Sequence, residues 1–123
     1  MLTSSIGLVL SWIGGLGIVA IGVAYLAKNE KNAAGFGLPV LPASDARGWW
    51  QVKGIRDVAS GLLVIVFTFA ARDQLALLVL VLVLIPLGDM WIVLSNEGDR
   101  KAALGIHGAT ALAMIVAAVL LFV

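Results

Sequence analysis

The amino-acid sequence predicts an all-α fold, a four-helix transmembrane bundle whose termini lie on the extracytoplasmic side. Of its 123 residues, 62% are hydrophobic and only 12% are charged, whereas a soluble domain carries about 25% charged residues. The apolar residues are gathered in runs close to the ~20 residues that cross the hydrocarbon of a bilayer. The basic residues cluster at one end of these runs. A net charge of +1 gives no reason to expect a nucleic-acid partner.

Four apolar runs mark the expected spans, at about residues 5–27, 48–71, 74–94 and 102–123. Together they form a single transmembrane domain over residues 1–123. The first five residues lack the basic region of a secretory signal, so we expect the first run to be retained as a span. Arg72 and Asp73 make a tight turn, and residues 95–101 make a short polar loop.

The first span carries small residues on one face, with Gly7, Ser11 and Gly15 spaced four apart. Such a face lets two helices approach closely. One interpretation is a homo-oligomer that forms through this glycine face. Packing within the chain is the favoured alternative, because small faces are common inside bundles.

Residues 28–48 are expected to form the one long loop. The segment is polar from Lys28 to Asn32, and from Gly35 to Pro42 it is apolar but interrupted by glycine and proline. It cannot be a span, because its backbone groups would not all be satisfied in lipid. A lid over a substrate is one interpretation. A connection lying at the membrane interface is the favoured one.

The basic residues predict the topology. Seven of the eight lysines and arginines fall on the side of the first and third connections, and Arg72 alone falls on the other side. By the positive-inside rule, the seven mark the cytoplasmic side. The sequence therefore predicts a multi-pass protein of the cell inner or plasma membrane.

Three ionisable residues fall at a similar depth in three different spans. Asp57 lies about nine residues into the second span, Asp89 about five residues before the end of the third, and His107 about six residues into the fourth. At the helical rise these positions are roughly 7–13 Å below the cytoplasmic surface. Facing an ionisable group to lipid is costly, so such a residue indicates a functional site. We expect all three to face one pocket that opens toward the cytoplasmic leaflet.

Further residues surround this cluster. Lys53 lies four residues before Asp57 on the same helical face, with Arg56 next to it, and both join the candidate catalytic set. Pro86 should kink the third helix just before Asp89. The candidate ligand-binding residues are aromatic or polar side chains near the cluster: Trp50, Trp91, Tyr25 and Gln51. For Trp49 and Trp50 an aromatic belt at the membrane interface is favoured.

These residue types permit general acid–base catalysis. A buried carboxylate can hold a proton, a second one beside a cation stays ionised, and a histidine shuttles protons near neutral pH. Our first hypothesis is a small membrane-embedded hydrolase or isomerase that acts on a lipophilic small molecule by epoxide opening or isomerisation. The expected partners are this molecule and membrane lipid. One histidine and scattered carboxylates lack metal-ligand spacing, so neither a metal nor a cofactor is expected.

Two alternatives come from other classes. The same groups can serve a non-catalytic transporter of a small molecule or a proton. The protein can also be a structural or accessory subunit of the membrane, in which the Lys/Arg–Asp network and a His107 bonded to a backbone carbonyl hold the helices in register. Ion pairs alone are a poor source of stability, which favours a functional site.

At these residues the sequence resembles the small four-span membrane proteins catalogued as domain of unknown function 4267. The resemblance covers nearly the whole chain and rests on four stretches: residues 35–37, 53–57, 85–89 and 105–108. It implies a compact four-helix membrane domain and no established activity. Small multidrug exporters are of similar length but centre on a carboxylate in the first span. The first span here has none, which argues against their mechanism.

Overall fold

The computed structural model describes residues 1–41 and 44–123, and within these ranges every regular element is a helix. The longer elements are α1 (Leu2–Ala27), α2 (Asn29–Phe36), α3 (Arg47–Ala70), α4 (Leu75–Leu82), α5 (Leu84–Ser95) and α7 (Ala109–Phe122). The shorter ones are the 3₁₀ turns η1 (Ser44–Ala46) and η2 (Arg72–Gln74), α6 (Arg100–Ala102) and the π-helical turn η3 (Ala103–Gly108).

Among the described residues, three helical segments are long and apolar enough to cross a membrane, namely Leu2–Ala27, Arg72–Ser95 and Arg100–Phe122. The remaining long helix, α3, has 24 residues and carries Lys53, Arg56 and Asp57 in its first half. The chain is therefore a helical membrane protein.

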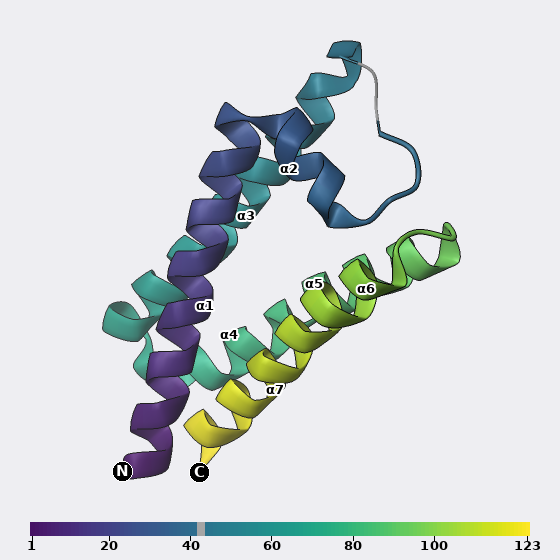
Figure 1. The fold of residues 1–123 in the computed structure, drawn as a ribbon. Coiled ribbons are helices and arrows are strands. Elements are labelled where there is room, and N and C mark those ends of the chain that lie inside the picture. Colours follow the sequence, from purple (N-terminus) through teal and green to yellow (C-terminus); the bar gives the residue numbers. More distant parts are fainter. Residues whose placement is uncertain (42–43) are drawn as a thin grey trace.

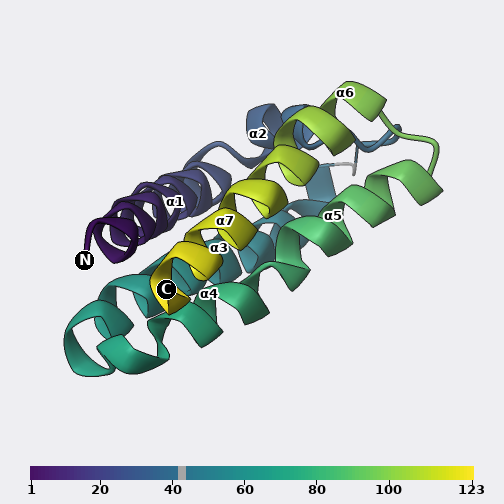
Figure 2. The same cartoon turned by 90° about the horizontal axis from the view of Figure 1, so that it is seen from below.

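The helices form two antiparallel pairs. In one pair α1 lies beside α3, and in the other the segment from α4 to α5 lies beside the segment from α6 to α7 (Figures 1 and 2). Both termini lie at the end where the pairs meet, and the pairs diverge toward the opposite end (Figure 1). There α2 lies between them. This arrangement leaves the middle of the molecule to be filled by side chains or by a cavity.

Glycines bring α1 and α3 into close contact. A Cβ atom on Gly22 would lie 2.6 Å from the Gly54 carbonyl oxygen, and one on Gly61 would clash with the Gly15 carbonyl oxygen. Near the beginning of α1, a Cβ atom on Gly7 would lie 3.0 Å from the Ala117 carbonyl oxygen of α7. The small residues of the first span therefore pack within the chain, as the favoured alternative expects.

Two groups of buried apolar side chains hold the pairs together. The larger group lies near the termini and consists of Val64, Leu75, Val79, Ala117 and Ala118. The smaller group, Phe36, Val93 and Ala103, lies at the other end and joins α2 to the second pair. Both groups are small, so the packing between the pairs is concentrated at the two ends.

The third long segment is interrupted at Val83, where α4 ends and α5 begins. Pro86 lies three residues further on and is buried. Its ring nitrogen has no hydrogen to donate to the Leu82 carbonyl, so the helix lacks that one hydrogen bond, while the Val83 N–H and carbonyl keep theirs. The expected disturbance of this helix by Pro86 therefore takes the form of an interruption at Val83, six residues before Asp89.

The expectation of a loop over residues 28–48 was wrong for residues 29–36, which form α2. The helix ends at Gly37, whose φ of 105° suits glycine. The Gly37 carbonyl then accepts a hydrogen bond of 2.7 Å from the Asp99 N–H. The connection is thus tied to the beginning of the last helical segment. Pro42, which the sequence places in the same loop, lies outside the described residues.

Candidate functional site

Lys53 and Asp57 form an ion pair inside the molecule. They lie one turn apart on α3, and the Lys53 Nζ is 2.6 Å from the Asp57 Oδ2. The Asp57 residue is only 5% exposed. The same Nζ lies 4.1 Å from the centre of the Tyr25 ring and 5.3 Å from that of Phe36. Two aromatic faces and a carboxylate therefore surround the ammonium group, which offsets part of the cost of its burial.

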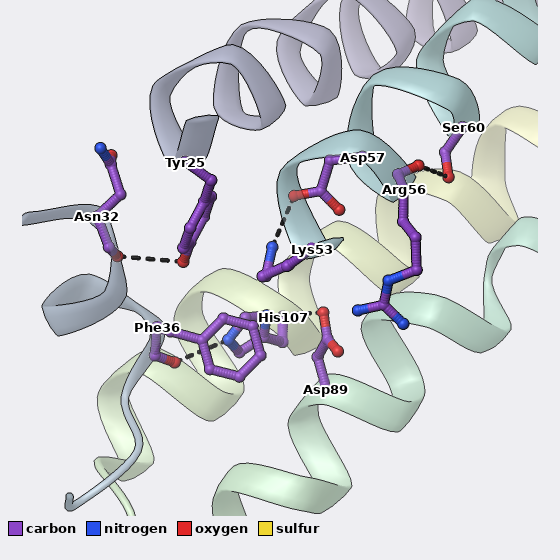
Figure 3. A network of polar contacts seen from close by, with 9 residues as sticks. All are labelled: Tyr25, Asn32, Phe36, Lys53, Arg56, Asp57, Ser60, Asp89 and His107. Carbon is purple, nitrogen blue, oxygen red and sulfur yellow. Dashed lines mark hydrogen bonds and ion pairs between the residues drawn. The ribbon is translucent and has the colours of Figure 1, made fainter. Parts of the chain in front are cut away.

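His107 faces this pair from the π-helical turn η3. Its Nε2 lies 2.9 Å from the Phe36 carbonyl oxygen, and its Nδ1 lies 3.9 Å from the Asp89 Oδ2 (Figure 3). A carbonyl only accepts hydrogen bonds, so the Nε2 carries a hydrogen and donates it. In the neutral ring the Nδ1 is then the free acceptor. This atom is directed toward Asp89, at a separation too long for a direct hydrogen bond.

Tyr25 and Asn32 attach α2 to the end of α1. The Tyr25 hydroxyl donates to the Asn32 carbonyl at 3.1 Å, and the Asn32 side-chain amide donates to the carbonyls of Lys28 at 2.8 Å and Ala24 at 3.2 Å. The Tyr25 ring stacks on that of Trp50, with centres 5.7 Å apart. These bonds fix the position of Phe36, whose carbonyl and ring both contact His107.

The polar cluster lies at one end of a cavity of about 490 Å³ between the two helix pairs. Lys53, Asp57, Asp89 and His107 all line it. Toward the other end its wall is mostly apolar and reaches Val64, Val79 and Ala117 of the larger core group, through residues of α1, α3, α4, α5 and α7. Cavities of this size hold drug-sized ligands, and an apolar wall with a few polar groups is typical of such sites.

The structure separates the candidate residues into two sets. Asp57, Asp89, His107, Lys53 and Tyr25 line the one cavity. The others lie outside its lining: Arg56, Gln51, Trp50 and Trp91. Arg56 is exposed beside Asp57, because successive helical residues are turned by about 100°.

Trp91 does not wall the cavity as we expected. It is 69% exposed and lies two residues after Asp89, which turns it about 200° around the helix, away from the cluster. Trp50 instead stacks on the outer side of Tyr25 and lines a smaller hollow with Glu30, Ala33 and Leu41. Gln51 is half-buried.

Sequence reasoning missed Phe36, which bonds His107 through its backbone and packs near the Lys53 ammonium. A contact that a residue makes through its backbone carbonyl cannot be predicted from the residue type. The available signal was that Phe36 is the one aromatic side chain of residues 28–48, placed between two glycines. Asn32 and Gly35 of the same helix also line the cavity.

The arrangement offers two acid–base pairs at the same end of the cavity. Lys53 supplies a cation beside Asp57, and His107 supplies a free acceptor nitrogen beside Asp89. An oxygen lying to the side of the Nδ1 and the Asp89 Oδ2, which are 3.9 Å apart, can be at hydrogen-bond distance, about 2.8 Å, from both. A group at that position would be close enough to exchange a proton with either partner.

A family model describes most of the chain. The model for the domain of unknown function DUF4267 matches residues 15–121, which include the whole polar cluster and all of the cavity lining except Leu10, Ser11, Ile13 and Gly14. Comparison with curated proteins and with solved structures gave no significant match. The resemblance noted from residues 35–37, 53–57, 85–89 and 105–108 is thereby confirmed. This chain belongs to the DUF4267 family.

Proposed function

We propose that the protein is a small enzyme of the membrane, a four-helix transmembrane bundle that performs acid–base chemistry on a lipophilic small molecule. The observation that carries the proposal is the cavity, whose apolar wall ends in Lys53, Asp57, Asp89 and His107. Its apolar part suits a hydrocarbon and its polar end suits one reactive oxygen group. Epoxide opening or isomerisation is the chemistry that fits these groups best.

For epoxide hydrolysis, the Nδ1 of His107 accepts a proton from a water as the water oxygen attacks an epoxide carbon. Asp89 stabilises the imidazolium that forms, while the Nε2–H stays bonded to the Phe36 carbonyl. The carbon–oxygen bond breaks, and the alkoxide takes a proton from the Lys53 ammonium, which Asp57 holds in place. The proton on His107 then passes through the cavity to Lys53 and restores the ammonium group. The product is a diol, with one water added.

Isomerisation uses the same groups without the water. The His107 Nδ1 removes a proton from a carbon next to the epoxide, and the ring oxygen receives a proton from Lys53. The product is an allylic alcohol of unchanged composition. General acid–base assistance of this kind accounts for about 10²–10⁴ in rate.

The wall of the cavity favours an enzyme over a transporter. A transporter needs a path that reaches both membrane surfaces. Here the cavity wall runs into buried Val64, Val79 and Ala117 at the end near the termini. This closed end supports a site that receives and returns its ligand from one region of the membrane.

The proposal is tested by turnover in vesicles. Purified protein reconstituted in phosphatidylcholine is given 9,10-epoxyoctadecan-1-ol, and the products are followed by mass spectrometry. We expect the diol or an isomer to form faster than in protein-free vesicles. His107→Gln should remove this gain. Binding of the epoxide without any catalysed conversion would contradict an enzyme and favour the non-catalytic carrier.

The proposed topology places both termini outside and the connection containing α2 inside. The chain contains no cysteine, so single cysteines report their side unambiguously. Lys31→Cys and Glu97→Cys, both at exposed positions, should react with an impermeant thiol reagent only after the cells are opened, because their side carries seven of the eight basic residues.

Asp73→Cys is the matched control, and it should react in intact cells. Reaction of positions 31 and 97 from outside, with position 73 protected, would invert the topology.

A further inference from the structure

The cavity is closed at its two ends. At the polar end, α2 covers it with Asn32, Gly35 and Phe36, and this helix is fastened by the Tyr25–Asn32 and Phe36–His107 hydrogen bonds. At the other end, α1 and α7 meet where Gly7 lies against Ala117, above the larger core group. A ligand that reaches the polar cluster must therefore pass through a side.

One side of the cavity is lined by exposed residues. They belong to two facing edges, Ile13, Gly14 and Ile21 of α1, and Ile106, Thr110 and Ala113 of the last helical segment. Between these edges the gap from α1 to α7 widens toward the end of the molecule where α2 lies (Figure 1). We name this gap the side opening. A Cβ atom added at Gly14 would meet nothing within 4 Å, so the edge formed by α1 has open space at that point.

The side opening lies at the depth of the hydrocarbon in the proposed topology. Ile21 and Ile13 are about 9 and 21 Å from the end of α1 at Ala27, at the helical rise. Ile106 and Ala113 are about 9 and 20 Å from Arg100 by the same measure. The hydrocarbon of a bilayer is about 30 Å thick. The opening therefore faces acyl chains rather than water or headgroups.

The charges at the polar end select the head of the occupant. The Lys53 ammonium is already paired with Asp57 at 2.6 Å, and a second carboxylate, Asp89, lies beside His107. An anionic head would face two carboxylates, and a cationic head would compete with an ammonium held between two aromatic rings. An uncharged oxygen group meets neither cost and finds both a donor and an acceptor.

From these observations we infer that the ligand enters sideways from the bilayer, through the opening between α1 and α7. The occupant is a membrane-dissolved molecule with one apolar chain and an uncharged oxygen head. Its head passes to Lys53, Asp57, Asp89 and His107, and its chain lies along the apolar wall toward Ala117. This inference rests on the proposed function for the site itself and adds the substrate class and its route.

The route is tested with octadecan-1-ol that carries a photoreactive diazirine in mid-chain, dissolved in phosphatidylcholine vesicles that hold the protein. After brief illumination, mass spectrometry locates the labelled residues. The wild type should be labelled on the deep cavity wall, at Val64 and Met114. Gly14→Trp should lower this labelling by about tenfold or more, which corresponds to 1.4 kcal/mol or more of binding free energy. Thr110→Trp, on the opposite edge, should act alike.

Gly17→Trp is the matched control. Gly17 is also an exposed α1 glycine without a neighbour within 4 Å, but it does not line the cavity, so its variant should be labelled like the wild type. Gel filtration in detergent shows that each variant is folded and of unchanged size. Unlabelled octadecan-1-ol should compete with the probe, and octadecanoate at high pH should compete far less.

The outcomes separate the two proposals. Deep labelling that Gly14→Trp and Thr110→Trp leave unchanged would overturn the sideways route while the site stands. Absence of deep labelling in the wild type would contradict the lipophilic site itself, and with it the proposed function. A Gly14→Cys protein that cross-links to its own copy in the membrane would make the opening an interface between two copies and would overturn entry from lipid.

Discussion

A protein in which Lys53→Met and Asp57→Leu are combined is expected to fold and to lose turnover by about 100-fold or more, the size of a general acid–base contribution. The two side chains form a pair that is 13% and 8% exposed. Replacing a buried pair by apolar groups of similar volume is often neutral or stabilising. Turnover falls because the cavity loses its ammonium donor. Conversion of 9,10-epoxyoctadecan-1-ol and the melting temperature in detergent measure the two effects.

The single change Asp57→Asn is the informative comparison. It also removes turnover, but it leaves the Lys53 ammonium buried without its carboxylate, which costs about 3–5 kcal/mol. The single variant should therefore melt below the double variant. A double variant that keeps wild-type turnover would show that the pair only supports the structure, and this result would contradict its role in the reaction.

Gly61→Ala is expected to lower the free energy of unfolding by about 1–3 kcal/mol, as overpacking does in a dense interior. The added Cβ would clash with the Gly15 carbonyl oxygen and with Val19. A backbone oxygen cannot rotate away as a flexible side chain does, so α1 and α3 must move apart. Thermal unfolding of the reconstituted protein measures the loss.

Gly88→Ala is the control, since a Cβ atom on this α5 glycine would meet nothing within 4 Å. Alanine favours a helix over glycine by about 1 kcal/mol, so this variant should be at least as stable as the wild type. If both alanines had the same effect, close contact of α1 with α3 would not be what holds the first pair together.

Most of the fold could be predicted from the apolar runs, because long uncharged segments of about 20 residues have few alternatives to a helix in lipid. The polar cluster followed from similar reasoning. Asp57, Asp89 and His107 belong to three different helices, but the cost of facing each of them to lipid directs all three to the interior. Helix phase also placed Lys53 beside Asp57, one turn away.

Two features were not predicted from the sequence, for different reasons. The outward direction of Trp91 was within reach of helix phase, because a residue two positions after an inward-facing Asp89 lies on the far side. The expectation that Trp91 lines the cavity rested instead on the frequency of aromatic residues in pocket walls. Helix α2 could not be predicted from the sequence, because its stability comes from tertiary contacts. Ala33 and Phe36 are buried although the segment is mostly polar.

The role of η3 could not be foreseen either. Its π-helical turn contains His107, and such turns occur often at functional sites. Gly105 and Gly108 lie within it, but glycines alone do not distinguish a π turn from a regular helix. The bond from His107 to Phe36 spans 71 residues, a separation that no local pattern reports.

Nitrogen NMR of the single histidine tests the site most directly. The chain has one histidine, so ¹⁵N-histidine labelling gives resonances of His107 alone. We predict a ring protonated at Nε2, which donates to the Phe36 carbonyl, with Nδ1 free. Addition of octadecan-1-ol to the vesicles should shift the Nδ1 resonance strongly and the Nε2 resonance little, because the alcohol bonds to the free nitrogen. A spectrum that the alcohol leaves unchanged in the wild type would contradict an acid–base site for a lipophilic molecule at His107.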